Sequence, residues 1–119
     1  MADKIKVLYV DDEEANLNVF RIAFKRKYDI TTAESAEAGL AILEKNSDFN
    51  VIIADHRMPG MSGIEMLAQV SEKYPGMTRI VISEYVNDEI IRNAIDSLNL
   101  DGSVGKPWDG EKLIELIEK

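Results

Sequence analysis

Short apolar runs alternate along the chain with segments of helical periodicity. Three runs are rich in β-branched residues and nearly continuous, at residues 5–10, 51–54 and 80–82. Runs of this kind are typical of strands covered on both faces, as in a parallel sheet. A more polar run at 28–32 indicates a strand nearer a sheet edge, and a short run at 101–106 contains two glycines, which are poor strand residues. The pattern predicts five strands, the last of them the weakest.

The segments that follow these runs carry apolar residues at helical spacing. The faces expected to point inward are Leu17, Phe20 and Phe24; Ala36, Leu40 and Leu43; Leu67 and Val70; Ile91, Ala94, Ile95 and Leu98; and Leu113, Leu116 and Ile117. Four of the helices are preceded by a residue that can cap a helix N-terminus, namely Ser35, Ser62, Asn87 and Asp109. Glu65, three residues after Ser62, completes the spacing of a capping box. Gly39 is expected to weaken the second helix by about 1 kcal/mol relative to alanine.

Strands that alternate with helices predict an α/β fold, a doubly wound parallel sheet of five strands with helices on both faces. Right-handed crossovers leave few topologies for such a sheet. Ligands bind to sheets of this type beyond the carboxyl ends of the strands. With 119 residues and no linker or internal repeat, the chain is expected to form one domain over residues 1–119.

Composition and charge exclude several classes of function. Fourteen Lys and Arg stand against 22 Asp and Glu, a net charge of −8, so direct binding to a nucleic acid backbone is not expected. Cysteine is absent and His56 is the one histidine, which excludes a thiolate nucleophile and a metal site built from several imidazoles. No apolar run approaches the ~18 residues that a membrane span needs, and the N-terminus lacks the apolar core of a signal peptide. We therefore expect a cytoplasmic protein with no membrane partner.

Polar side chains stand at the carboxyl ends of four of the five runs. Asp11 and Asp12 follow the first run, Asp55 the third and Ser83 the fourth, and Lys106 ends the fifth. Since the carboxyl ends of parallel strands meet at one edge of a sheet, these side chains are expected to lie together. Three carboxylates gathered there would raise one another's pKa. A Mg²⁺ ion, which prefers oxygen ligands, would remove that cost.

This arrangement suits phosphoryl transfer. Asp55 is placed to act as a carboxylate nucleophile toward phosphorus, giving an acyl phosphate. The reaction needs positioning and charge neutralisation more than acid–base groups. Lys106 can supply a cation to the phosphoryl oxygens, and Ser83 a hydroxyl donor.

Each of these residues has a plainer interpretation when it is taken alone. Asp11 and Asp12 could be solvated acids that favour the start of a helix. Asp55 could be a turn residue, and Lys106 could belong to a simple loop because Pro107 disfavours helix in the residue before it. The phosphoacceptor hypothesis rests on the agreement of all the strand ends.

At these residues the sequence resembles the receiver domains of response regulators in two-component signalling. The resemblance covers essentially the whole chain, and the residues that carry it are VLYVDDE at 7–13, IIAD at 52–55, MPGMSG at 58–63, Ser83 and the pair Lys106-Pro107. Four short pieces resemble a subgroup of receivers that is often fused to output domains, including HD-type cyclic-dinucleotide phosphodiesterases: Tyr74-Pro75, Arg79-Ile80, Ser83-Glu84-Tyr85 and Lys106-Pro107-Trp108.

The resemblance implies a flavodoxin-like (βα)5 fold with strand order 2-1-3-4-5. It implies a phosphoacceptor switch of a phosphorelay, in which Asp55 receives a phosphoryl group from a histidine kinase or a phosphotransfer protein. The reaction would depend on Mg²⁺, bound by Asp12, Asp55 and the backbone carbonyl of Arg57, with Asp11 acting mainly through water.

The resemblance also implies how the signal would leave the site. Ser83 would turn toward the phosphoryl group and Lys106 would pair with it. The resulting population shift would change the face formed by the fourth helix, the fifth strand and the fifth helix, where an output domain or effector protein would bind. This is the action of a switch and not of an enzyme.

Two residues depart from the family pattern. Receivers usually carry tyrosine or phenylalanine three residues before Lys106 as a rotamer switch, and here Ser103 stands there, although Tyr85 could substitute. The residue after Ser83 is usually small, and here it is Glu84, whose carboxylate could narrow the entrance and repel a phosphodonor. These departures keep open an alternative, a receiver-like protein-interaction module that works without phosphorylation.

A stand-alone enzyme on a similar fold is a third hypothesis, which the motifs do not support. A flavodoxin needs a phosphate-binding loop rich in Ser, Thr and Gly after the first strand, where this chain has four acidic residues at 11–14. No glycine-rich nucleotide-binding motif occurs. Haloacid-dehalogenase-like phosphatases usually begin with two aspartates separated by one residue, whereas Asp11 and Asp12 are adjacent.

Overall fold

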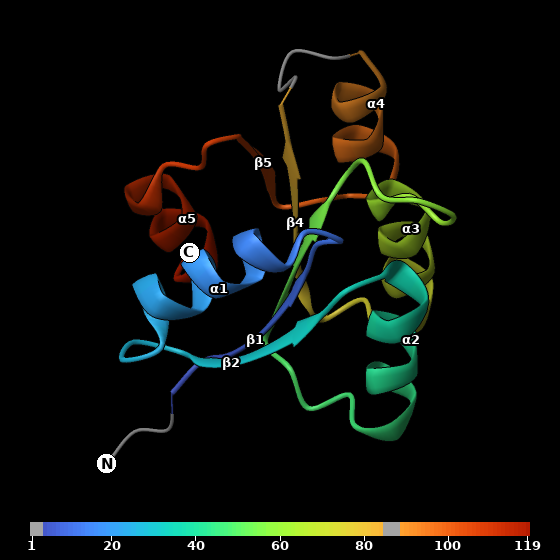
Figure 1. The fold of residues 1–119 in the computed structure, drawn as a ribbon. Coiled ribbons are helices and arrows are strands. Elements are labelled where there is room, and N and C mark those ends of the chain that lie inside the picture. The colour runs from blue at the N-terminus through green and yellow to red at the C-terminus, as the bar shows by residue number, and fades with distance from the viewer. Residues whose placement is uncertain (1–3, 85–88) are drawn as a thin grey trace.

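The computed structural model describes residues 4–84 and 89–119, which form five successive strand–helix units (Figure 1). The strands are β1 (Lys6–Val10), β2 (Asp29–Ala33), β3 (Val51–Asp55), β4 (Thr78–Ser83) and β5 (Gly102–Gly105). The helices are α1 (Glu14–Phe24), α2 (Ala36–Lys45), α3 (Gly63–Lys73), α4 (Glu89–Ser97) and α5 (Gly110–Ile117).

The strands form one parallel sheet in the order β2-β1-β3-β4-β5. The predicted doubly wound α/β fold and its flavodoxin-like strand order are therefore confirmed. The polar run near residue 30 is an edge strand, as predicted, and the glycine-containing run is the opposite edge. Figure 1 shows α1 and α5 on one face of the sheet and α2, α3 and α4 on the other.

Each face of the sheet has its own apolar core, because successive strand residues point to opposite faces. Leu8 and Val10 belong to the core under α2, α3 and α4. Val7 and Tyr9 belong to the core under α1 and α5, which also holds Phe20. Within the described ranges, no helix has both the length and the apolar character that crossing a bilayer requires.

The predicted helix starts are observed wherever the structure describes them. Ser35 Oγ accepts a hydrogen bond from the backbone N–H of Ala38. Ser62 and Glu65 form the predicted capping box, with both hydrogen bonds at 3.1 Å. Asp109 caps α5, whereas Asn87, the predicted cap of the fourth helix, lies outside the described residues.

The helices bury most of the residues predicted to face inward. The buried ones are Leu17, Phe20, Phe24, Ala36, Leu43, Leu67, Val70, Ile91, Ala94, Leu113 and Ile117. Leu40, Ile95, Leu98 and Leu116 are partly buried against the same cores. The periodicity of the sequence thus identifies the packed face of each helix.

Gly39 is needed because α2 approaches the sheet closely at that position. A Cβ atom there would lie 3.1 Å from Cγ2 of Val10 and 3.3 Å from Sδ of Met66. Both contacts are tighter than ordinary van der Waals packing, so a methyl group would push α2 outward. The loss of helix propensity at Gly39 is offset by this packing of α2 against β1 and α3.

Candidate functional site

The carboxyl ends of β1 and β3 bring three aspartates together. Val10 and Ala54 are register partners in these adjacent strands, so Asp11, which follows β1, lies beside Asp55, the last residue of β3. One carboxylate oxygen of each of Asp11, Asp12 and Asp55 lies within 4.8 Å of the other two. Oxygen ligands at this separation suit a hard divalent cation. The donor set therefore fits Mg²⁺.

The three aspartates differ in their surroundings. Asp11 is completely buried, and its carboxylate accepts hydrogen bonds from the backbone N–H of Glu13 at 2.9 Å and from Nδ2 of Asn16 at 3.1 Å. Asp55 is almost as buried, whereas Asp12 is exposed. Asp11 is thus fixed by the residues around the start of α1, and Asp55 and Asp12 lie on the side that opens to solvent.

Lys106 supplies the cation that the sequence predicts for this site. Its Nζ lies 3.1 Å from Oδ1 of Asp55 and 3.4 Å from Oδ2 of Asp11. The backbone of Lys106 is held at the end of β5, where its N–H donates to the carbonyl of Ser83 at 3.1 Å. A single ammonium group therefore bridges the two buried carboxylates.

Burial and pairing shift the pKa values of this pair. Burial is the main cause that raises the pKa of Asp55 to about 6; the hydrogen bond from Lys106 opposes it, and the charge of Asp11 adds to it. Burial by itself would lower the pKa of Lys106, but its hydrogen bond to Asp55 and the charges of Asp55 and Asp11 outweigh burial and raise it. The sequence predicts that repulsion among the acids raises the carboxylate pKa. In the structure, desolvation of Asp55 is the larger effect.

The remaining predicted residues line one small cavity beside Asp55. This cavity has a volume of about 110 Å³ and is lined by Asp12, Glu13, Asp55, Arg57, Ser83, Glu84 and Lys106. Ser83 is buried at the end of β4 and Arg57 lies in the segment between β3 and α3. The structure thus brings together the predicted residues from four strand ends, with Asp11 buried behind the lysine.

Glu84 and Glu13 add negative charge to the same cavity. Glu84 is exposed and is one of the residues that line the cavity. That its carboxylate narrows the entrance stays a prediction. The lining by Glu13 was not predicted, and its position directly after Asp12 is the sequence signal that could have indicated it. An anionic phosphodonor would meet both carboxylates as it approaches.

The position of the missing aromatic residue is occupied by a short polar side chain in β5. Ser103 is half-buried and pairs in register with Val81. Tyr85, which the sequence analysis offered as a substitute, lies outside the described residues. The aromatic side chains near the site include the buried Tyr9 and the partly buried Trp108.

Tyr9 is 1% exposed and stacks on Phe20 with ring centroids 4.1 Å apart. Its hydroxyl is buried and makes no hydrogen bond of standard geometry with the residues that the structure describes, and Trp108 is a weak potential donor to it. Burial, followed by the charges of Asp11 and Asp55, raises the pKa of this phenol. Trp108 packs edge-on against Phe20 at 5.9 Å. Sequence reasoning missed Tyr9, although its place two residues before Asp11 puts both side chains on the same face of β1 and its extension.

Comparison with known proteins identifies the family. Residues 7–118 match the family described as the response regulator receiver domain. The hydrogenase transcriptional regulatory protein HoxA of Cupriavidus necator is 34% identical over 120 residues, which cover all of this chain and 25% of that protein. The chain thus spans about a quarter of the length of that relative.

Two solved structures have the same fold over almost their full length. A CheY-like response regulator receiver domain protein from Methanospirillum hungatei is 28% identical, with a TM-score of 0.88 over 98% of this chain and 92% of that chain. The signal receiver domain of an HD domain-containing protein from Pseudomonas fluorescens is 25% identical, with a TM-score of 0.87 over 97% of this chain and 92% of that chain. The chain accordingly belongs to the receiver domain family, the signalling domains of response regulators in two-component systems.

Proposed function

We propose that this receiver is a phosphoacceptor switch in which Asp55 accepts a phosphoryl group from the phosphohistidine of a histidine kinase or phosphotransfer protein. The observation that carries the proposal is the 3.1 Å contact between Asp55 Oδ1 and Lys106 Nζ, inside a cavity that also reaches Asp12 and Ser83. The nearly buried carboxylate of Asp55 can act as the nucleophile, and the ammonium group beside it is in place to neutralise the negative charge of the acyl phosphate that forms.

The transfer exchanges one bond to phosphorus for another. A carboxylate oxygen of Asp55 forms a bond to phosphorus while the bond between phosphorus and the donor histidine nitrogen breaks, and the electron pair of that bond stays with the imidazole. Lys106 neutralises charge on the phosphoryl oxygens, and the Ser83 hydroxyl donates a hydrogen bond to one of them. No proton has to leave Asp55, which is mostly ionised at pH 7 with a pKa of about 6.

The acidic cluster would hold the metal ion that the reaction needs. Asp12, Asp55 and the backbone carbonyl of Arg57 would bind Mg²⁺ directly, with Asp11 acting through water. When bound, Mg²⁺ neutralises the negative charge that the acids and the phosphoryl group bring together. Asp11 keeps Lys106 in place, because the ammonium group contacts both buried carboxylates.

Phosphorylation would then redistribute the contacts of Ser83 and Lys106. These residues belong to the ends of β4 and β5 and are joined by the hydrogen bond from Lys106 N–H to Ser83 O. A shift of Ser83 toward the phosphoryl group therefore acts on the segments that lead into α4 and α5. We place the binding surface for an output domain or effector protein on the face formed by α4, β5 and α5.

The proposal is tested by the intact mass of the chain after incubation with acetyl phosphate and Mg²⁺. One phosphate adduct on the wild type, absent from Asp55→Asn and absent after chelation of Mg²⁺, is the expected result. An unmodified wild type under conditions in which a second receiver is modified would contradict it.

The second candidate is an interaction module that works without phosphate, and the carboxylate of Glu84 at the cavity opening is the observation that favours it. A partner of such a module would bind wild type and Asp55→Asn with equal affinity, with and without beryllium fluoride. A partner of the phosphoacceptor switch would discriminate between these states.

A further inference from the structure

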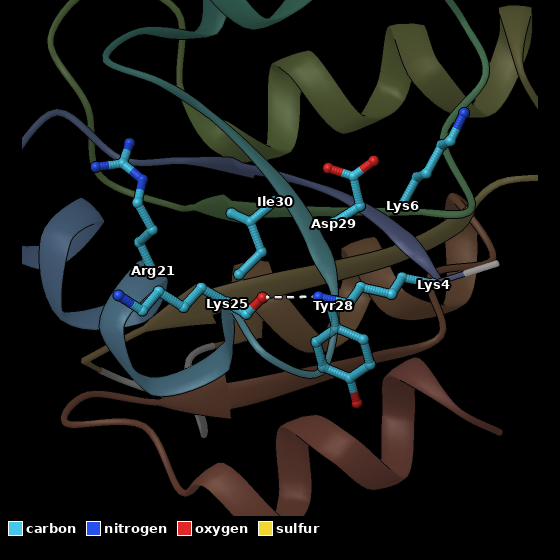
Figure 2. Close-up of a pocket in the computed structure, with 7 residues that line it drawn as sticks. All are labelled: Lys4, Lys6, Arg21, Lys25, Tyr28, Asp29 and Ile30. Atoms are coloured by element: carbon cyan, nitrogen blue, oxygen red, sulfur yellow. Dashed lines mark hydrogen bonds between the residues drawn. The ribbon is translucent and has the colours of Figure 1, made fainter.

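A basic hollow lies at the opposite end of the sheet from the phosphoacceptor site. It has a volume of about 610 Å³ and surrounds the start of β2; the charged residues that line it are four cations, Lys4, Lys6, Arg21 and Lys25, and one carboxylate, Asp29 (Figure 2). The amino ends of β1 and β2 lie here, whereas Asp11 and the other strand-end residues lie at the carboxyl ends. The hollow is therefore independent of the proposed phosphorylation chemistry.

Three of these cations form no ion pair with any acid that the structure describes. Lys6 forms a 2.6 Å ion pair with Asp48. In contrast, Lys4 Nζ donates to the carbonyl oxygen of Lys25, and Arg21 donates to side-chain oxygens of Asn18 and Thr32, all of which are neutral acceptors. Within residues 4–84 and 89–119, no carboxylate forms an ion pair with Lys4, Arg21 or Lys25. The four cations face Asp29 in the lining and Asp48 beside Lys6, which leaves a local excess of positive charge in a chain of net charge −8.

The same place carries an open backbone edge. β2 is the last strand of the sheet, and no other strand in the described part of the chain covers its outer side. The N–H of Asp29 donates to Ile5 O, and Ala33 O accepts from the N–H of Asp11, so these residues direct their backbone groups toward β1. Since alternate residues of a parallel strand point to opposite neighbours, Ile30 and Thr32 present their N–H and C=O groups outward.

The cations stand on both sides of this edge. Figure 2 shows Arg21 and Lys25 on one side of the β2 ribbon and Lys6 on the other. A strand added beside β2 would project successive side chains alternately toward these two sides. Its acidic side chains would meet Arg21 and Lys25 on one side and compete with Asp48 for Lys6 on the other.

We propose that the outer edge of β2 binds an extended acidic segment of a partner protein as an added strand. Backbone hydrogen bonds to Ile30 and Thr32 would provide the affinity, and Lys4, Arg21 and Lys25 would select acidic side chains. A second copy of this chain is disfavoured as the occupant, because edge-to-edge pairing would set the same cations opposite one another. Basic residues at an open edge deter neutral and basic strands, and the same residues attract an acidic one.

The experiment measures binding of a fluorescein-labelled octapeptide of alternating Glu and Thr to the whole chain by fluorescence anisotropy. We expect saturable binding that weakens as salt rises. The double variant Arg21→Glu/Lys25→Glu should raise the Kd by about tenfold or more. The matched control, Arg92→Glu/Lys112→Glu on α4 and α5, changes the net charge equally at exposed positions away from β2 and should leave the Kd within about twofold.

A second probe separates strand addition from attraction by charge alone. An octapeptide of the same sequence, N-methylated at alternate residues on the edge that faces β2, keeps every charge and loses the backbone donors. We expect the methylated peptide not to bind. The unmethylated peptide should shift the amide resonances of Ile30 and Thr32 in the unmodified chain, a measurement that needs no variant. Equal binding of the methylated peptide would overturn the proposal, as would equal loss of binding in the control variant. Competition by inorganic triphosphate at the same concentration as the peptide would also overturn it and assign the hollow to small anions.

Discussion

The ammonium group of Lys106 lies 3.1 Å from Oδ1 of Asp55, although the two residues come from the ends of different strands. The same group lies 3.4 Å from the fully buried Asp11. The lysine thus neutralises two buried carboxylates. In the proposed phosphorylation, the same ammonium group would contact the oxygens of the phosphoryl group on Asp55. The stability and the reactivity of the site are therefore coupled through one side chain.

Replacement of Lys106 by methionine should destabilise the fold at neutral pH. The variant leaves two buried carboxylates without their cation, and removal of one partner of such a cluster costs about 3–5 kcal/mol. The cost should shrink toward pH 5, because Asp55 binds a proton more readily without the lysine. Urea unfolding at both pH values, in the presence of a chelator, measures the difference. Lys112→Met, at an exposed position of α5, is the control and should change the unfolding free energy by less than about 0.5 kcal/mol.

The pH dependence of stability should reveal the raised pKa of Asp55. Its pKa is about 6 in the folded chain and 3.8 in the reference state, so the folded state binds this proton more tightly. The unfolding free energy should therefore fall as pH rises from about 4 to about 6, by roughly 1–3 kcal/mol in the absence of Mg²⁺. Asp55→Asn should remove this slope and be the more stable protein at pH 7. A slope that is the same in wild type and variant would assign the titration to another group.

Gly63 should be irreplaceable even by alanine. It begins α3 beside the end of β3, and a Cβ atom there would lie 2.8 Å from the carbonyl carbon of Asp55. Such a clash with backbone cannot be relieved by a rotamer change, so Gly63→Ala should cost about 2–4 kcal/mol and displace Asp55. Gly76→Ala, where nothing lies within 4 Å of the added atom, should be neutral or slightly stabilising. Thermal unfolding of both variants tests the contrast.

The buried hydroxyl of Tyr9 should contribute nothing to stability. It makes no hydrogen bond of standard geometry with any described residue, while the ring keeps its stacking on Phe20. Tyr9→Phe should therefore be neutral or stabilise the fold by up to about 1 kcal/mol. Loss of more than about 1 kcal/mol in chemical unfolding would show that the hydroxyl has a partner in solution.

Removal of the carboxylate at the cavity opening should speed phosphorylation by small donors. Glu84 is exposed and lines the cavity of about 110 Å³ beside Asp55, where it repels an anionic donor. Glu84→Ala should accelerate modification by acetyl phosphate several-fold at low ionic strength and less at high ionic strength. Glu111→Ala, an equal loss of charge on α5, serves as the control. Equal rates in wild type and Glu84→Ala at every salt concentration would exclude this role.

Much of the fold and of the candidate site follows from the sequence for simple physical reasons. Apolar runs of strand length between helical segments predict the doubly wound sheet, and a parallel sheet gathers its strand ends at one edge. The sequence alone therefore predicts that Asp55, Ser83 and Lys106 lie close together, and in the structure they line one cavity.

What the sequence did not reveal depends on close approach in three dimensions. The role of Gly39 depends on its distance to Val10 and Met66, which come from other elements. The main cause of the Asp55 pKa is burial, which requires the packed structure. The basic hollow at β2 is lined by residues from separate segments, which include the residues before β1, α1 and β2, so no single sequence motif predicts it.

The central claim, that Asp55 is the phosphoacceptor, is tested most directly by chemical trapping of the acyl phosphate. The chain is incubated with acetyl phosphate and Mg²⁺ and reduced with borohydride, which converts a phosphorylated aspartate to homoserine, and the peptides are sequenced by tandem mass spectrometry. Our account predicts homoserine at residue 55 alone, dependent on Mg²⁺. Homoserine at Asp11 or Asp12, or none in a wild type that is folded and modified in intact mass, would contradict it.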